Sequence, residues 1–532
     1  MLRVGIILDS EEVSFWIADL INEISQHKNI HLAVVVSHEN RFKRNPKTAY
    51  SLFRKIDHTL LPGKPNVLAK VKPGLPKEVP LVKVIPINTE TGISYSAEDL
   101  ENIKRNEVDV LLHFSTENPT GEILTLCKYG VWGLQAGEGT SFNSNSVGFW
   151  EWYHQTPVTK ISLWQLNNQP GKNECMASSL TKTEYLSLSR NQTSVFSKGI
   201  DLLIGTLVRF TTSEYSKRND AWLNRAFESS NPGTWTSLFA VGKLLSRVVS
   251  KSITKVLFIE QWVLFFSFSS PNFPQLNFRN FKPLIPPKDR IWADPFVVSE
   301  NDKHYLFIEE LRTKTNKGHI SCMVLNKNGE VENPTIIIDQ PFHLSYPFIF
   351  QHEGTWFMVP ESADNMTVDL YECLEFPFKW KFKKSLLTNV RAFDATLHFH
   401  DGKVWLFCTI QKRSGSSTND DLHIFFAEHL LDAEWKPHAG NPVLSNPYSA
   451  RPAGRIFEVN NSWYRPSQIC VPRYGYGLSL NRITKLDESN YHEENINEIL
   501  PDWRKNLLST HTLNFVRDLT IIDGQIKRFR FF

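Results

Sequence analysis

The sequence lacks the short motifs that identify many enzyme classes. Neither GxGxxG nor GxxxxGKS/T occurs in its 532 residues, so no glycine-rich loop is predicted to bind phosphate. No group of His, Cys, Asp and Glu residues has the spacing of a metal site. The sequence therefore predicts no cofactor and no metal.

Cysteines are few and irregularly spaced. The six, none of them in a CxxC pair, are Cys127, Cys175, Cys322, Cys373, Cys408 and Cys470. Disulfide frameworks and zinc sites have paired or regular spacings, and this pattern has neither. The sequence therefore predicts buried free thiols in a reducing compartment.

Long apolar runs and a strong net charge are also missing. The best run, Val256 to Phe268, is interrupted by Glu260 and Gln261 and is too short to span a bilayer. The chain opens on a buried-strand pattern, Arg3-Val-Gly-Ile-Ile-Leu, without the basic and apolar regions of a signal peptide. A net charge of +3 gives no support for nucleic-acid binding. We therefore expect a cytoplasmic protein without a nucleic-acid partner.

What the sequence does contain is a pattern that recurs four times between Ile291 and Gln468. Each copy has two apolar, aromatic-rich strands joined by a turn containing Gly or Asn, which is the sequence signature of a β-hairpin. The copies open at Trp292-Ala-Asp-Pro-Phe-Val-Val, Ser345-Tyr-Pro-Phe-Ile-Phe, Phe393-Asp-Ala-Thr-Leu-His-Phe and Arg451-Pro-Ala-Gly-Arg-Ile-Phe. A strand repeat of about 50 residues predicts a β-propeller.

Further strand-like runs bring each repeat to about four strands, which make one propeller blade. A fifth blade is expected from residues before Ile291 and after Tyr476. The same place in each repeat, at or just before the start of the innermost strand, is held by Asp294, Tyr346, Asp394 and Arg451. Equivalent positions of successive blades meet at one end of the central channel, so these four side chains are expected to share one pocket.

Two resemblances rest on these motifs. Ala293-Asp294-Pro295 before an apolar strand, with Asp394 two repeats later, resembles the five-bladed propeller of family 43 glycosidases and their relatives. The blocks ADPFVV, YPFIF with MVPES, FDATLHF, ARPAGRIF with YRPSQ, YGLSLNRIT, and HTLNFV with IIDG are similar to the N-terminal domain of the plant glucosamine inositolphosphorylceramide transferase family. That family carries its transferase signature in a separate domain, which this sequence does not show.

The glycosidase resemblance implies roles for the two aspartates. Asp294 matches the catalytic base, and Asp394 matches the second aspartate, which tunes the acid. The acid of that family, a Glu before Gly-Pro in the fourth blade, is replaced here by Arg451. This change removes the proton donor and adds a permanent cation, which suits a phosphate or carboxylate ligand better than a neutral glycoside.

Another carboxyl group would have to replace the missing acid. We assign Glu361, at the end of a second strand, as catalytic together with Asp294 and Asp394, while Glu309 and Glu310 hold similar positions. The candidates for substrate binding offer cationic, amide or aromatic groups: Arg451, Arg455, Arg465, Tyr346, Gln468, Tyr474 and Trp292. The alternative is that the two aspartates cap turns and pair with the arginines, which would make the cluster structural.

Residues 1–193 show a different pattern, in which strands and helices alternate. Four strands and two helices are predicted: Val4–Leu8, His31–Ser37, Leu81–Pro86 and Val108–Phe114, with Phe15–Ser25 and Ala97–Arg105. Such alternation predicts a parallel, doubly wound, Rossmann-like sheet. The basic, proline-rich stretch from Arg41 to Lys77 is expected to be an excursion over the surface.

The order of elements after Val108 resembles the N-terminal domain of formyltransferases. That family has an Asn-x-His motif on its second strand and an Asp in a later loop, which assist proton transfer as an amine attacks the formyl carbon. Here Trp132 and Leu134 stand at the best match to Asn and His, and the loop 167–174 has no Asp. General acid–base catalysis is worth about 10²- to 10⁴-fold, so the domain is expected to be catalytically silent. Its remaining expected role is to bind a nucleotide or nucleotide sugar at the carboxyl ends of its strands.

Residues 194–270 are expected to form a helical linker. Lys243, Arg247, Lys251 and Lys255 recur every four residues with apolar residues between them, so one helix face is basic and another apolar. Two interpretations stand. Residues 238–257 lie on an anionic membrane, or the helix packs on a domain with its lysines in water.

The predicted organisation is a formyltransferase-like α/β domain (1–193), a helical linker (194–270) and an all-β five-bladed propeller (271–532). We expect a carbohydrate-active protein of glycan or glycolipid biosynthesis that transfers a sugar from a nucleotide- or phosphate-linked donor at the propeller channel. The alternatives are a glycoside hydrolase with Asp294 as base, a non-catalytic glycan-binding scaffold and, least favoured, an amino-sugar formyltransferase. The expected partner is a sugar or glycan, and any membrane contact is expected to be peripheral, at the inner face.

Overall fold

The computed structural model describes residues 1–39, 48–137, 140–142, 144–169, 172–211, 231–268, 273, 276–431 and 434–531. They form two compact units, Met1–Ser250 with Arg413–Ser417, and Lys251–Lys412 with Thr418–Phe532. Parts of four expected features lie outside the described residues: 41–47 of the surface excursion, 170–171 of the later loop, 212–230 and 269–270 of the linker, and 271–272 and 274–275 at the start of the propeller range.

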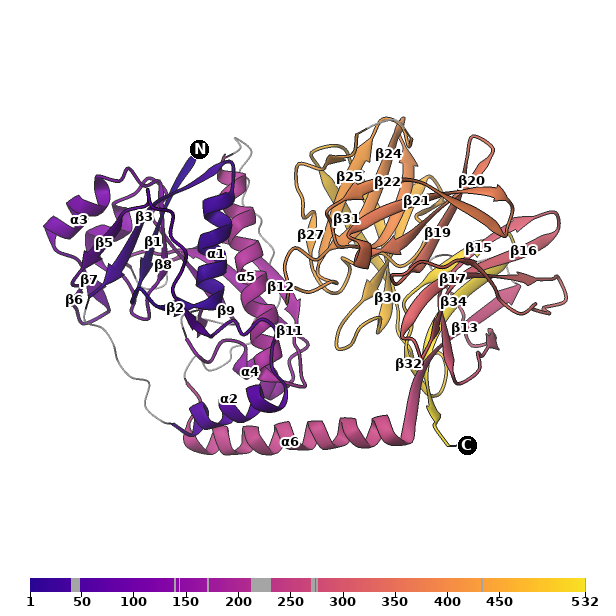
Figure 1. Ribbon diagram of the computed structural model, residues 1–532, viewed down its shortest axis with the longest axis horizontal. Helices are drawn as coiled ribbons and strands as arrows, with labels where there is room; N and C mark the ends of the chain where they lie inside the picture. Colours follow the sequence, from indigo (N-terminus) through magenta and orange to yellow (C-terminus); the bar gives the residue numbers. More distant parts are fainter. Residues whose placement is uncertain are drawn as a thin grey trace. The chain divides into compact units, whose positions relative to one another are not determined.

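The first unit is an α/β domain around one mixed sheet (Figure 1). The strand order is β12-β11-β9-β8-β1-β3-β5, with β10 beside β9. The strands from β9 to β5 are parallel, as expected, whereas β11 and β12 add an antiparallel edge. The unit's strands are β1 Leu2–Leu8, β2 Val13–Ser14, β3 Ile30–His38, β4 Lys70–Val71, β5 Leu81–Val84, β6 Ile87–Asn88, β7 Ile93–Ser94, β8 Val110–Phe114, β9 Val131–Ala136, β10 Thr140–Ser141, β11 Val158–Gln165 and β12 Glu174–Lys182.

Helices cover both faces of this sheet. α1 (Phe15–Gln26) and α5 (Leu188–Thr211) pack on one face, and α3 (Ala97–Lys104) and the 3-10 turn Gly121–Thr125 pack on the other. The two faces arise because successive side chains of a strand point to opposite sides. Val4, Ile6 and Leu8 of β1 therefore join the core under α1, while Ile7 joins the core under α3.

The stretch expected to be a surface excursion contains a helix, α2 (Ala49–Leu60), and the short strand β4. Thr48 caps the helix, accepting a hydrogen bond from the backbone of Ser51, whose side chain in turn accepts one from the backbone of Thr48. Tyr50 and Phe53 are buried against α4 (Phe149–His154). The prediction of a surface excursion was wrong for this part. It was based on the basic, proline-rich composition of the stretch and did not take account of the helical spacing of the two aromatic residues.

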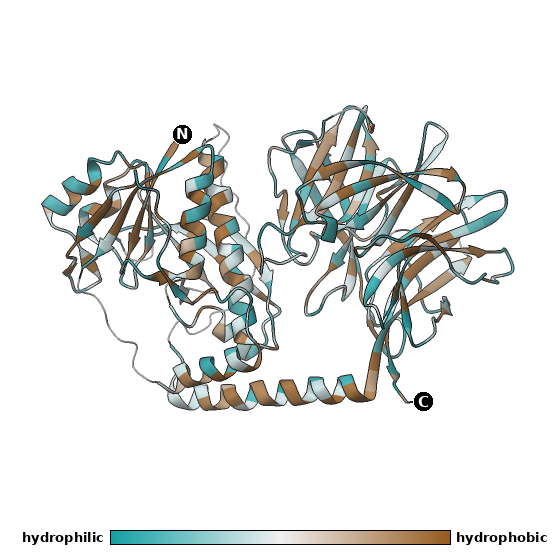
Figure 2. Cartoon of the chain, in the orientation of Figure 1, coloured by the Kyte–Doolittle hydropathy of each residue, from teal (hydrophilic) through white to brown (hydrophobic). Residues whose placement is uncertain are grey.

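Within the range predicted as a helical linker, Thr234–Leu257 forms helix α6 and Phe258–Phe268 forms strand β13. The amino-terminal part of α6 packs on the first unit through Ala240 and Leu244, which are buried, and two basic side chains add polar contacts beside them. Lys243 Nζ lies 3.9 Å from the ring centre of Tyr153, and Arg247 donates hydrogen bonds to the carbonyls of Tyr185 and Trp152. Figure 2 shows that apolar residues recur along the whole of α6. Those of a second sector, which begins with Trp235, Leu238 and Phe239, are exposed.

The second unit is a five-bladed β-propeller, as predicted. Blade one is β15 Arg290–Glu300, β16 Lys303–Arg312, β17 Lys317–Leu325 and β18 Thr335–Ile338; blade two is β19 Ser345–His352, β20 Thr355–Ser362, β21 Thr367–Glu375 and β22 Lys379–Thr388. Blade three is β23 Ala392–His400, β24 Lys403–Ile410, β25 Asp421–Ala427, β26 Lys436–Pro437 and β27 Leu444–Ser445. Blade four is β28 Phe457–Val459, β29 Ser462–Ile469, β30 Gly477–Leu486 and β31 Tyr491–Ile499.

Blade five joins the two ends of the propeller sequence. Its sheet runs β14-β13-β34-β32, with β33 beside β34. Its strands are β13 Phe258–Phe268, β14 Lys282–Leu284, β32 Leu507–Ser509, β33 Leu513–Val516 and β34 Leu519–Phe529. β13 and β34 pair along their whole length, from Phe258 opposite Phe529 to Phe268 opposite Leu519. The ring of blades is therefore closed by backbone hydrogen bonds. Among the described helices, none has the length and apolar character needed to cross a membrane.

Candidate functional site

The repeated sequence produces the same irregularity in the first strand of blades one, two and three. The strand pairing shifts between Ala293 and Phe296, between Ser345 and Phe348, and between Phe393 and Thr396. Inside each bulge one residue has positive φ: Asp294 (49°), Tyr346 (43°) and Asp394 (52°). Positive φ is uncommon for residues other than glycine, and such conformations concentrate at functional sites. The three bulges give these side chains equivalent positions around the channel.

Asp394 lies in a cluster of side chains from three blades. Arg451 binds its carboxylate with two hydrogen bonds, of 2.6 Å from Nε and 3.1 Å from Nη2. Gln468 Nε2 donates a third, of 2.7 Å, to Asp394 Oδ2. Glu361 Oε2 accepts from the backbone N–H of Asp394 at 3.3 Å and from Arg451 at 3.4 Å. Arg451 is therefore held by two carboxyl groups, and the ring centre of Tyr474 lies 5.0 Å from its guanidinium carbon.

Glu361 favours its neutral form. Burial, followed by the neighbouring charge of Asp394, raises the pKa of Glu361 well above its usual value, and Arg451 offsets only part of this. Glu309 occupies the equivalent place one blade earlier, because it pairs with Ala293 as Glu361 pairs with Ser345. Burial and the charge of Asp294 likewise raise the pKa of Glu309 well above its usual value. Both glutamic acids are thus set up as proton donors.

Asp294 belongs to a second group, formed with residues of blade five. Its carboxylate accepts a 2.7 Å hydrogen bond from the Thr512 hydroxyl and lies 3.7 Å from His511 Nε2. Its backbone N–H donates to Asp523, which also accepts from His511 Nδ1 at 2.6 Å. Burial raises the pKa of Asp294 to about 6; His511 opposes this shift, and Asp394 adds to it. Asp294 therefore changes charge near neutral pH.

His511 is the positive partner of that group. Burial alone would lower the pKa of His511, but the charges of Asp523 and Asp294 outweigh it and raise the pKa to about 9. The imidazole stacks on Trp262, with ring centres 3.9 Å apart. Ligand atoms of Asp294, His511 and Asp523 lie within 4.8 Å of one another, so this trio is the candidate metal set among the described residues. The 2.6 Å His511–Asp523 contact is that of a charge-assisted hydrogen bond.

Tyr346 lies between blades. Its hydroxyl contacts the Thr396 hydroxyl at 2.8 Å and accepts a 2.7 Å hydrogen bond from the backbone N–H of Gly454. Gly454 has φ 138°, and an added Cβ there would meet the Leu513 carbonyl oxygen at 2.1 Å, so only glycine allows this approach. Tyr346 thus links blades two, three and four at the level of the bulges.

Three of the predicted binding residues lie apart from the carboxyl cluster. Arg465 pairs with Glu493 inside blade four, through hydrogen bonds of 2.8 and 2.7 Å. Arg455 donates to the carbonyl of Ile349 and lies over Phe348. Trp292 packs into an apolar cluster shared by blades one and five. Glu310 is held by Arg290, His319 and Ser321, and despite burial these contacts lower its pKa to about 2.

The sequence analysis missed His511, Thr512 and Asp523. His511 and Thr512 open the block HTLNFV, and Asp523 lies in the block IIDG. Their polar residues within apolar strand patterns were the available signal. In the structure they are buried, with exposed fractions of 2%, 0% and 0%.

The combined site can hold and transfer protons in a desolvated environment. It brings together the carboxyl groups of Asp294, Asp394, Asp523, Glu309 and Glu361, with exposed fractions of 0 to 8%. Arg451 and His511 supply the positive charge. Burial is the largest cause of the raised pKa values of Glu309 and Glu361, and the repulsion between neighbouring carboxyl groups adds to it.

The α/β domain is apolar at the two positions that the sequence analysis matched to the formyltransferase motif. Trp132 and Leu134 are 0% and 3% exposed within the apolar core under α1 and α5. His113 is buried, and burial lowers its pKa to about 4. His154 stacks on Trp150. Trp132 and Leu134 are therefore part of the packed core.

Comparisons with known proteins agree with the repeat analysis. Residues 287–516 match the family model described as glucosamine inositolphosphorylceramide transferase 1, N-terminal. The relative of that name from Arabidopsis thaliana is 34% identical over 204 residues, which is 38% of this chain and 26% of the relative. The chain thus spans about a quarter of the length of that relative.

Two solved structures are similar at low levels. A family 43 glycoside hydrolase from Bacillus licheniformis, BlXynB, is 15% identical with TM-score 0.30, covering 41% of this chain and 47% of its own. A glycinamide ribonucleotide transformylase from Symbiobacterium toebii is 13% identical with TM-score 0.28, covering 41% and 92%. Because both the identities and the TM-scores are low, the fold of each unit is assigned from its strand order and not from these similarities. The sequence match concerns the propeller: residues 287–516 match the model of the N-terminal domain of the glucosamine inositolphosphorylceramide transferase family.

Proposed function

We propose that the propeller catalyses sugar transfer in glycan or glycolipid assembly, with Asp294 as general base and Glu361 as general acid. The observation that carries the proposal is the cluster of buried carboxyl groups at the bulged strands, held by contacts with Arg451 and His511. Asp294, with a pKa of about 6, can accept the proton of an acceptor hydroxyl. Glu361, whose pKa burial raises well above its usual value, can give a proton to the leaving group.

The roles of the neighbouring residues follow from their contacts. Arg451 and Gln468 fix the Asp394 carboxylate through hydrogen bonds, and burial followed by the charge of Asp394 raises the pKa of Glu361. In this proposal Arg451 is a positioning residue, whereas the sequence analysis predicted that it binds the substrate. His511 holds Asp294 through charge attraction, while Thr512 orients it.

The proposed donor is a nucleotide- or phosphate-linked sugar, and the proposed acceptor is a glycan or glycolipid. Support comes from the relatives, which are named glucosamine inositolphosphorylceramide transferase 1. Glycoside hydrolysis is the second candidate, because a carboxylic acid and a carboxylate base also suit an inverting attack by water. A glycan-binding scaffold is the non-catalytic alternative.

The test uses Asp294→Asn and Glu361→Gln, with Asp518→Asn in an exposed turn as the matched control. Each protein is incubated with nucleotide sugars and inositolphosphorylceramide, and separately with aryl glycosides, and the products are identified by mass spectrometry. We expect transfer that falls about 10²-fold or more in both site variants and is unchanged in the control. In the active protein kcat/KM should rise with pH through about 6 as Asp294 ionises. Release of free sugar only would favour the hydrolase, and binding without turnover would favour the scaffold.

We also propose that α6 rests on a lipid surface, where a glycolipid substrate would be found. Large apolar side chains on α6 are exposed: Trp235, Leu238, Phe239, Leu245, Val249, Ile253, Val256 and Leu257. At 3.6 residues per turn they fall within about one third of the helix circumference, and no charged residue lies in that sector. Exposed apolar patches of this kind mark interaction sites. Lys251 and Lys255 lie on the opposite side of the helix, so the apolar sector is the part of α6 that we propose contacts lipid.

Vesicle sedimentation tests this surface. The native chain should bind vesicles of phosphatidylcholine with phosphatidylglycerol, and the double variant Leu245→Glu, Val249→Glu should lose binding. Leu374→Glu, an exposed apolar residue of the propeller, is the control. Light scattering distinguishes the competing occupant. A dimer that the double variant dissociates, without vesicle binding by the native chain, would assign α6 to a second copy of the chain instead.

A further inference from the structure

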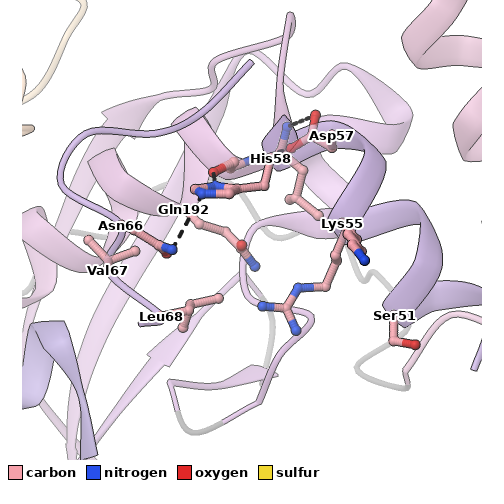
Figure 3. A pocket seen from close by; sticks show the side chains of 11 residues that line it. Ser51, Lys55, Asp57, His58, Asn66, Val67, Leu68 and Gln192 are labelled. Carbon is pink, nitrogen blue, oxygen red and sulfur yellow. Dashed lines mark hydrogen bonds between the residues drawn. The ribbon is translucent and has the colours of Figure 1, made fainter. Parts of the chain in front are cut away.

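The α/β domain contains a cavity of about 280 Å³ that the proposed function does not use. Its walls come from α2, from the segment 66–68 and from the first turns of α5. Figure 3 shows Val67 and Leu68 on one side of this space and Lys55 on the other. The volume lies near the lower end of the range for small-molecule sites, which is about 300 to 1,000 Å³.

The walls are fixed in place before any ligand binds. Asp57 of α2 is buried and accepts hydrogen bonds from the backbone N–H groups of Leu188 and Ser189 and from the Ser187 hydroxyl. It thereby caps the amino-terminal end of α5 and ties α2 to it. On the other wall, the carbonyl of Val67 accepts a hydrogen bond from the backbone N–H of Trp16, at the start of α1. The cavity is therefore preformed.

The cavity has an excess of positive charge. Arg54 and Lys55 line it, and neither forms an ion pair with a carboxylate in the part of the chain that the structure describes. The acidic residue of the lining, Asp57, already uses its two oxygens on α5. The Arg54 guanidinium carbon is 5.9 Å from the ring centre of Tyr50, a contact that leaves its N–H groups available as donors.

Neutral polar groups complete the lining. Gln192 is 3% exposed, and its Nε2 donates to the carbonyls of Asn145 and Val147, which leaves its own carbonyl oxygen as an acceptor. Asn66 lies at the rim, where its side-chain nitrogen is 3.4 Å from His58 Nε2. His58 Nδ1 lies 2.9 Å from the Ser189 hydroxyl. These contacts orient the imidazole toward the rim.

We propose that this cavity binds a small phosphomonoester, such as a sugar phosphate. Arg54 and Lys55 bind the phosphate oxygens by charge-assisted hydrogen bonds. Gln192 accepts a hydrogen bond from a hydroxyl of the ligand, and the faces of Val67 and Leu68 contact its apolar side. The α/β domain then serves as a binding module for a phosphorylated sugar, independently of the chemistry assigned to the propeller.

Isothermal titration of the full chain tests the proposal with inorganic phosphate, glucose 1-phosphate and glucose as probes. The double variant Arg54→Gln, Lys55→Gln should lose at least about 10-fold in affinity for glucose 1-phosphate, which equals about 1.4 kcal/mol. Lys104→Gln, on exposed α3, is the matched control and should bind as the native chain does. Gln192→Leu should weaken glucose 1-phosphate more than inorganic phosphate, because it removes only the hydroxyl contact.

Hydrogen exchange measured by mass spectrometry locates the ligand. Glucose 1-phosphate should slow exchange in peptides covering 48–60 and 62–70 of the native chain, and should leave the propeller peptides unchanged. Protection confined to the propeller, equal binding by native and doubly substituted chains, or binding of glucose as strong as that of glucose 1-phosphate would each overturn the proposal. The Gln192 variant keeps both cations, so it tests the site even if the double variant folds poorly.

Discussion

The two units of this protein differ in the polarity of their buried side chains. In the α/β domain, Trp132 and Leu134, which the predicted resemblance to formyltransferases matches to Asn and His, are packed in an apolar core. In the propeller, the centre holds five carboxyl groups that are paired, hydrogen-bonded or neutral. Burying charge is costly unless it is compensated. The carboxyl cluster of the propeller is therefore stable because each charged group has a partner. The α/β domain has an apolar core at the positions compared.

The largest effect should come from removing the cation of the propeller cluster. Arg451→Ala leaves Asp394 buried without its ion pair, and we expect a loss of about 3–5 kcal/mol in the free energy of unfolding. Urea denaturation, with propeller peptides followed by hydrogen exchange, measures it. Arg473→Ala is the control, because Arg473 pairs with Glu260 at the surface and should cost no more than about 1 kcal/mol. Equal losses of unfolding free energy in the two variants would mean that the buried Arg451–Asp394 pair contributes no more than the surface pair.

The stability of the propeller should depend on pH through the titration of His511. Its folded pKa, about 9, lies above the usual value of 6.5, so its contribution is complete below pH 6.5 and is lost as pH rises through 9. The expected loss is about 3 kcal/mol. Unfolding midpoints between pH 6 and 10 measure it, and His511→Gln should flatten the curve. A variant with the native pH dependence would show that another group is responsible.

A polar substitution in the α/β core should lower the stability of the first unit. Leu134→Asn buries an amide among apolar neighbours, and we expect a loss of about 1–3 kcal/mol from its desolvation. Leu52→Asn, at an exposed position of α2, is the control and should change stability by no more than about 0.5 kcal/mol. Thermal unfolding of the first unit compares them. If Leu134→Asn were fully tolerated, this core would have room and partners for a polar side chain, contrary to the contrast drawn above.

The smallest effect should come from replacing Glu361, because burial and the charge of Asp394 raise its pKa and favour its protonated form. Glu361→Gln keeps the size and the hydrogen-bonding capacity of protonated Glu361, so stability should change by about 1 kcal/mol or less. Asp394→Asn should cost more, because it removes the charge that Arg451 pairs with. Denaturant titrations at pH 7 rank the two. The reverse order would mean that Glu361, and not Asp394, carries the negative charge.

The blades and much of the candidate site were predictable from local sequence signals. Strand alternation and turn residues indicated the four hairpins and the equivalence of Asp294, Tyr346 and Asp394, and the shared bulges follow from the shared sequence. The same kind of signal predicted the alternating elements of the α/β domain from Leu2–Leu8 onward. These features depend on residues close together in the chain, which is why no tertiary information was needed for them.

The partners of the site residues, in contrast, depend on the folded chain. Arg451 meets Asp394 and Glu361, and His511 meets Asp294, because closing the ring through β13 and β34 brings together blades that are far apart in the chain. The sequence pattern of α6 likewise showed a basic and an apolar face but not which face packs on the protein. Side-chain pairing and desolvation depend on distances in the folded chain, and these distances also set the pKa values on which the proposed chemistry rests.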